Sequence, residues 1–195
     1  IHSLSDLVTD LIVLFTHRIG KMPQDEDHPY GHGRAETIGA TVIGLLIIVT
    51  GIGVTYKTWE TINEISEQAP GLLAASAALL SILINEGLFH YTRRVGEATK
   101  SPALIANAWH HRSDAISSIA ALIGIVGASQ GFPFMDPLAG AVVGILIVKV
   151  GIDITREGTR DLMDTALSDE HTEKIHSILK EIPEILHFHD LRTRV

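Results

Sequence analysis

Two stretches of the sequence place a histidine and an aspartate four residues apart within an apolar run. His110 and Asp114 open the run that continues to Val126, and His2 and Asp6 stand in the first residues of the chain. Residues i and i+4 lie on the same face of a helix, so each run presents an imidazole beside a carboxylate. If two such helices met, the four side chains would supply the nitrogen and oxygen ligands of a tetrahedral divalent cation.

Asp10 follows Asp6 by one further helical turn and extends the polar stripe of the first run. We expect its carboxylate to line the cavity or to orient a ligand rather than to bind the ion itself. Ionisable side chains are costly to bury in hydrocarbon, so their presence in an apolar span indicates a functional site.

The composition indicates a helical membrane protein. Hydrophobic residues make up 46% of the 195 residues and charged residues 19%, against about a quarter charged in an average soluble domain. The net charge of -8 argues against a nucleic-acid partner, because nucleic-acid-binding domains are usually basic. The absence of cysteine excludes disulfides and thiolate metal sites.

Five apolar segments are long enough to predict membrane spans within a transmembrane domain of residues 1–156. They are residues 1–19, 35–62, 71–95, 102–128 and 136–156. Basic residues flank the first and third connections and are absent from the second and fourth, which places the first and third in the cytoplasm. A cytoplasmic N-terminus would then require one more helix before Ile1.

Residues 157–195 have the composition of the first part of a small cytoplasmic α/β domain. Ser168 is a suitable N-cap for an amphipathic helix that Pro183 would end. The alternating residues 191–195 predict a half-buried strand.

The polar loop of residues 20–34 contains a second candidate metal site. Asp25, His28 and His32 offer one carboxylate and two imidazoles, which can bind zinc with one position left open. A flexible loop holds metal weakly, so an exposed loop that only concentrates cations is an equally open interpretation.

Four motifs resemble those of the cation diffusion facilitator family of divalent-metal transporters. They are HSLSD at 2–6, DEDHPYGHGRAE at 25–36, HHRSD at 110–114 and HDLRTR at 189–194. The resemblance implies a homodimer with six transmembrane helices, of which this chain would hold the second to the sixth. It also implies a metallochaperone-like α/β domain after them.

The resemblance assigns a transport site with two ligands from each of two helices. Carried onto this chain, the ligands are His2, Asp6, His110 and Asp114. Manganese-transporting members usually have aspartate on both helices, so His110 argues against manganese. Imidazole suits zinc, copper, nickel or iron. We therefore expect Zn²⁺, with Fe²⁺ as in the magnetosome branch, cadmium or cobalt as alternatives.

The resemblance also assigns residues outside the transport site. The loop triad matches a second metal site of some bacterial zinc members, and His189 matches one ligand of a site in the cytoplasmic domain. Arg34 and Asp164 match a pair that locks the membrane and cytoplasmic parts together.

These residues predict export of a divalent cation in exchange for protons, because imidazole and carboxylate must be deprotonated to bind metal. The expected partners are metal ions, protons, membrane lipid and a second copy of the chain. The expected location is the bacterial inner membrane or an internal membrane such as that of the magnetosome, crossed several times. No HExxH or similar motif accompanies the ligands, so we expect no enzymatic activity. A metal-sensing membrane scaffold with little flux stays open as an alternative.

Overall fold

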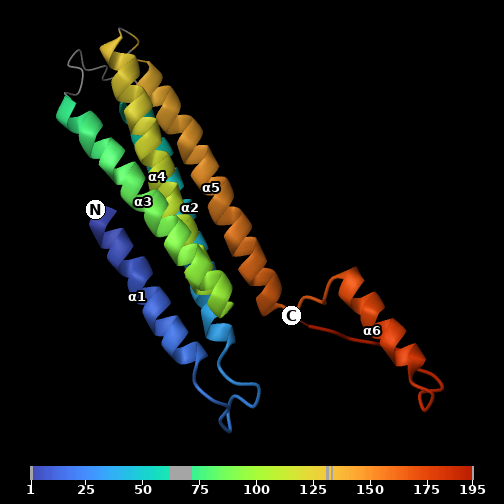
Figure 1. Ribbon diagram of the computed structural model, residues 1–195. Helices are drawn as coiled ribbons and strands as arrows, with labels where there is room; N and C mark the ends of the chain where they lie inside the picture. The colour runs from blue at the N-terminus through green and yellow to red at the C-terminus, as the bar shows by residue number, and fades with distance from the viewer. Residues whose placement is uncertain (1, 62–71, 131, 133, 195) are drawn as a thin grey trace.

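The computed structural model describes residues 2–61, 72–130, 132 and 134–194, with the backbone alone described for residues 2–5, 61, 72, 73, 128, 129 and 136. These residues form helices and contain no strand (Figure 1). In chain order the helices are α1 His2–Gly20, α2 Arg34–Thr61, α3 Leu72–Thr99, α4 Pro102–Ser129, α5 Met135–Leu162 and α6 Asp169–Glu181.

Helices α1 to α5 run up and down as one bundle, and each covers one of the predicted spans (Figure 1). The clearest difference is α5, which continues to Leu162, past the predicted end at residue 156. The helix continues through the polar residues after 156 because no proline follows there, and Gly158 is held within the helix where it packs against Thr41 of α2. Two described helices, α2 over Arg34–Glu60 and α5 over Pro137–Leu162, are long and apolar enough to cross a membrane.

The pair α2 and α5 is held together by glycines that face each other. A β-carbon added to Gly51 would lie 2.9 Å from the carbonyl oxygen of Gly144. One added to Gly151 would lie 2.8 Å from the carbonyl oxygen of Gly44. Small residues at a crossing let the two main chains approach closely, which is how helices associate in membranes.

Helix α4 contacts α1, α2, α3 and α5 and forms the centre of the bundle. Its buried apolar residues are all alanines, which lets the neighbouring helices pack closely: Ala103, Ala106, Ala108, Ala115 and Ala120. The same packing buries the polar side chains of His110, Ser113 and Asp114. The HHRSD motif therefore lies in the interior.

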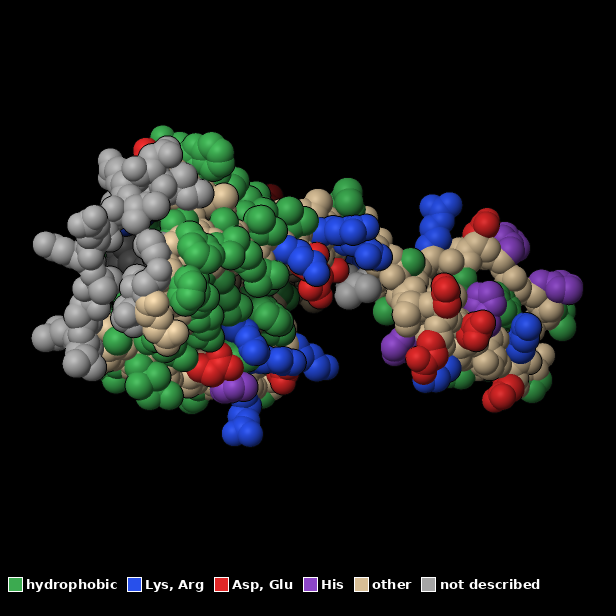
Figure 2. Space-filling model, turned by 90° about the horizontal axis from the view of Figure 1, so that it is seen from above, with side chains coloured by type: hydrophobic (Ala, Val, Ile, Leu, Met, Phe, Trp, Pro, Cys, Tyr) green, Lys and Arg blue, Asp and Glu red, His purple; other side chains and the backbone are tan. Residues whose placement is uncertain are grey.

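The outer surface of the bundle is hydrophobic. Large apolar side chains are more than half exposed on α1, α2, α3 and α5, as at Leu14, Val49, Leu83 and Ile145. Figure 2 shows mostly hydrophobic side chains on this face of the bundle and mixed charges on the C-terminal part. An apolar surface of this extent suits contact with lipid, and helices satisfy their backbone groups internally there.

The C-terminal part lies beyond the end of α5, where α6 begins directly after Ser168 as predicted (Figure 1). The Ser168 hydroxyl contacts the His171 ring at 2.7 Å instead of a backbone N–H. Residues 188–194 run back toward α5, and the backbone N–H of Leu167 donates to Thr193 Oγ1 at 3.1 Å. The segment 191–194 is not a strand and has no neighbouring strand among the described residues. The α/β character of this part stays a prediction.

Candidate metal sites

Helices α1 and α4 bring three of the predicted ligands together. Nε2 of His110 lies 3.2 Å from Oδ1 of Asp6 and 3.7 Å from Oδ2 of Asp114. The side chains of His110 and Asp114 are 2% and 7% exposed, whereas that of Asp6 is 42% exposed. We call Asp6, His110 and Asp114 the intramembrane cluster. Because Asp6 is the exposed member, an ion can reach the cluster from the side of α1.

The spacing of the intramembrane cluster fits a tetrahedral ion. With metal–ligand bonds of about 2.0–2.1 Å, neighbouring ligand atoms of a tetrahedron lie roughly 3.3–3.4 Å apart. The two distances from His110 Nε2, 3.2 and 3.7 Å, lie on either side of that value. Two carboxylates beside a neutral imidazole also carry the charge that a divalent cation neutralises.

The fourth predicted ligand, His2, begins α1 one helical turn before Asp6. Its side chain lies outside the described residues, so its place in the cluster stays a prediction.

Next to the intramembrane cluster, a hydrogen bond joins α1 to α4. Nδ2 of Asn107 donates to Oδ1 of Asp10 at 3.2 Å. Asn107 is 4% exposed, whereas Asp10 is exposed. Asn107 is not among the predicted site residues, although a polar residue inside an apolar span is a signal that could have found it.

The loop between α1 and α2 brings Asp25, His28 and His32 together. Oδ1 of Asp25 lies 3.0 Å from Nδ1 of His28, and Oδ2 lies 3.4 Å from Nε2 of His32. Nδ1 of His32 contacts the carbonyl oxygen of Pro23 at 3.2 Å. By donating its proton there, His32 would leave Nε2 free to bind a metal ion.

Local hydrogen bonding also sets the charge of Asp25. The backbone N–H of His28 donates to Asp25 Oδ1 at 2.6 Å, and this bond is the main reason that the pKa of Asp25 lies below its ordinary 3.8. The His28 and His32 side chains lower the same pKa further. Asp25 therefore stays ionised to a lower pH than an ordinary aspartate.

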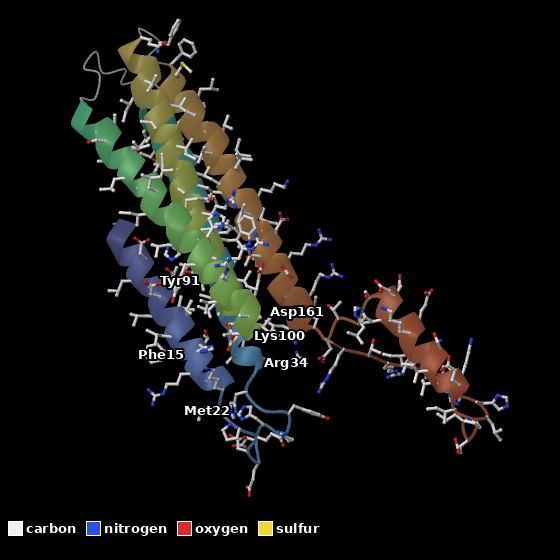
Figure 3. The ribbon with its side chains drawn as sticks, in the orientation of Figure 1. Phe15, Met22, Arg34, Tyr91, Lys100 and Asp161 are labelled. Atoms are coloured by element: carbon white, nitrogen blue, oxygen red, sulfur yellow. The ribbon has the colours of Figure 1, made fainter. Side chains whose placement is uncertain are left out.

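Arg34 and Asp164 meet where α2 begins and α5 ends. The Arg34 guanidinium pairs with Asp164 Oδ1 and also donates to the carbonyl oxygen of Leu162 at 2.8 Å. Asp164 has a φ of 57°, the left-handed conformation common just after a helix end. In Figure 3, Arg34, Lys100 and Asp161 lie at one end of the bundle, the loop end, where α2 begins and α3 and α5 end.

His189 is not brought to any other predicted ligand in the described part of the chain. Its side chain is 90% exposed, and its Nδ1 lies 3.4 Å from Oδ2 of Asp190. The nearby Arg194 instead stacks on Tyr30 of the first loop, with the guanidinium 4.3 Å from the ring centroid.

A charged contact outside the predicted site residues anchors α4 to α3. Arg112 lies 3.8 Å from Glu86 and stacks on Phe89, with its guanidinium 4.4 Å from the ring centroid. The contact holds Arg112, which lies between His110 and Asp114 in the sequence, against α3 and so supports the orientation of the HHRSD motif.

Comparison with known proteins places residues 1–163 in the family described as the cation efflux transmembrane domain. The chain is 36% identical to metal tolerance protein C1 of Arabidopsis thaliana, over 99% of the chain and 44% of the relative. It is also 36% identical to magnetosome protein MamB of Magnetospira sp. (strain QH-2), over 99% of the chain and 66% of the relative. It is 30% identical to the manganese efflux system protein MneP of Bacillus subtilis, over 100% of the chain and 67% of the relative. The chain thus spans about half to two thirds of these relatives.

Proposed function

The chain belongs to the cation efflux, or cation diffusion facilitator, family of divalent-metal transporters, and we propose that it exports such an ion in exchange for protons. The observation that carries this proposal is the intramembrane cluster, in which His110 and Asp114 are buried and the donor atoms all lie within 4.8 Å of one another. We include His2 as its fourth ligand, one turn from Asp6 on the same helix.

The same three side chains can hold either a metal ion or protons. When the metal leaves, the carboxylate of Asp114 remains in a buried site, and an uncompensated charge there is costly. A proton on Nε2 of His110 would pair with Asp6 and Asp114 at the observed 3.2 and 3.7 Å. Metal and proton thus compete for one nitrogen atom, which is the physical basis of exchange.

The proposed ion is zinc, because an imidazole with carboxylates suits Zn²⁺. Fe²⁺ accepts the same donors and is the second candidate, supported by the similarity to magnetosome protein MamB. Manganese is a third candidate because of the similarity to manganese efflux system proteins, although His110 argues for a softer ion. Cadmium and cobalt remain alternatives.

The proposed topology places the loop end of the bundle in the cytoplasm. Arg18, Lys21, Arg93, Arg94 and Lys100 all lie in or next to connections at that end. The loop triad would then collect ions at the cytoplasmic entrance, with Arg34 and Asp164 joining the bundle to the C-terminal part. We further propose that α1–α5 each cross the membrane in contact with lipid and that the protein is a homodimer in a bacterial inner or magnetosome-type membrane. The C-terminal part would belong to an α/β domain in which His189 binds metal.

The test is metal flux in proteoliposomes, with zinc, iron(II) and manganese(II) offered separately under an imposed pH gradient. Asp114→Ala should abolish flux, because it removes a buried ligand of the cluster. Asp153→Ala is the matched control, since it removes an exposed carboxylate from α5 and should leave flux within about twofold. Flux that survives in Asp114→Ala would disprove the site, and bound metal without flux would favour the scaffold interpretation.

A further inference from the structure

We propose that Asp10, Asn107 and His111 form a second divalent-cation subsite, one helical turn from the intramembrane cluster toward the loop end of the bundle. The proposal rests on the transport function above. It adds a step in which the ion is held by oxygen ligands and an imidazole before it reaches the cluster.

The position of the subsite follows from the antiparallel course of α1 and α4. Asp10 comes four residues after Asp6 on α1, and Asn107 comes three residues before His110 on α4. Both steps lead toward the loop end, and the bond from Asn107 Nδ2 to Asp10 Oδ1 shows that the residues meet there. With a rise of about 1.5 Å per residue, the subsite lies roughly 5–6 Å from the cluster.

The subsite repeats the donor pattern of the cluster. In the cluster, α4 supplies His110 and Asp114 at i and i+4, and α1 supplies one carboxylate. In the subsite, α4 supplies Asn107 and His111, also at i and i+4 and hence on one face. The ring of His111 lies beside that of His110, with the two ring centroids 6.1 Å apart.

The buried amide of Asn107 points to a ligand. Its Oδ1 is fully buried and has no hydrogen-bond partner among the described residues. A buried polar atom without a partner costs free energy, so such atoms usually serve a purpose. Carboxamide and carboxylate oxygens are ligands that divalent cations accept. A half-turn of the amide would replace the N–H beside Asp10 with Oδ1, giving the ion two oxygen ligands from different helices.

A plain hydrogen bond between helices is the competing explanation, since polar side chains join helices in membranes in this way. It accounts for the contact between Asp10 and Asn107. It does not account for the unpartnered Oδ1 atom or for the imidazole of His111 on the same face of α4.

The experiment measures initial zinc flux against zinc concentration in proteoliposomes of the full chain. Asp10→Asn keeps the size of the side chain and its ability to bond Asn107, but removes the charge. The subsite predicts an apparent KM for zinc about tenfold higher, with the maximal rate within about twofold of wild type. The control Asp153→Asn makes the same charge change at an exposed position of α5 and should leave KM unchanged.

An apparent KM for Asp10→Asn equal to that of Asp153→Asn would overturn the proposal. If Asp10→Asn does not fold, the variant Asn107→Asp distinguishes the subsite from a plain hydrogen bond. The subsite predicts that this variant folds and binds zinc with an equal or lower KM, because the new carboxylate is a better ligand. The plain hydrogen bond predicts that two facing carboxylates destabilise the protein.

Failure of transport itself is distinguishable. If the wild-type chain carries no zinc, the proposed function fails, and equilibrium dialysis of zinc then tests the subsite alone. In protein carrying Asp25→Ala and Asp114→Ala, the subsite predicts residual bound zinc that Asp10→Asn weakens about tenfold. Residual binding that Asp10→Asn leaves unchanged would disprove it.

Discussion

Replacing Gly51 by alanine tests the close packing of α2 on α5. The added methyl group would lie 2.8 Å from Val148 Cγ2 and 2.9 Å from both Gly144 O and Val148 N. Ordinary contacts between heavy atoms are about 3.5–4.0 Å, so the helices must separate by several tenths of an ångström. Two of the three atoms belong to the backbone of α5 and cannot rotate away. Overpacking of this kind costs about 1–3 kcal/mol.

The matched variant is Gly53→Ala on the same helix. A β-carbon at Gly53 meets nothing within 4 Å. Both substitutions gain the same roughly 0.5–1 kcal/mol from a stiffer unfolded chain, so the difference between them isolates the clash. Reversible unfolding in mixed detergent micelles should show Gly51→Ala less stable than Gly53→Ala by about 1–3 kcal/mol. Equal stabilities would refute the glycine contact between α2 and α5.

Two further predictions concern the loop end of the bundle. His28→Pro removes the backbone N–H that lowers the pKa of Asp25, so an NMR titration should show the pKa of Asp25 rising toward 3.8. His28→Ala keeps this N–H and should change the pKa of Asp25 less. Because the folded-state pKa is lowered, ionised Asp25 favours the folded loop above pH 3.8, and this contribution is lost as the pH falls through the lowered value. Arg34→Gln loses the ion pair with Asp164 and the hydrogen bond to the carbonyl oxygen of Leu162, so it should lower the free energy of unfolding by about 1 kcal/mol. Arg34→Lys should lower it by less. An unchanged free energy of unfolding in Arg34→Gln would contradict the proposed lock.

The bundle was predictable because long apolar segments separated by polar loops leave few alternatives to packed helices. The end predicted at residue 156 rested on apolar content, which marks a membrane boundary and not a helix end, and no proline follows until Pro183. Helix α5 therefore continues to Leu162, where Asp164 in the left-handed conformation follows the last turn. The strand predicted at 191–195 could not be judged from one segment, because a strand forms only with a partner.

The local pair of His110 and Asp114 was predictable from i, i+4 spacing alone. Contacts between helices were not, because they depend on how α1 and α4 are aligned across 97 residues of sequence. The bond from Asn107 to Asp10 is of this kind. So is the contact between Glu86 and Arg112, which requires α3 and α4 to meet at one particular register.

The most direct test of the central claim is the proton count during metal transport. Proteoliposomes of the full chain that enclose a pH-sensitive dye should show protons moving opposite to zinc after a zinc pulse. Collapse of the pH gradient by an ionophore should slow zinc flux, and Asp114→Ala should remove both signals. Zinc flux that continues at the same rate without a pH gradient and moves no protons would contradict exchange of metal for protons at His110.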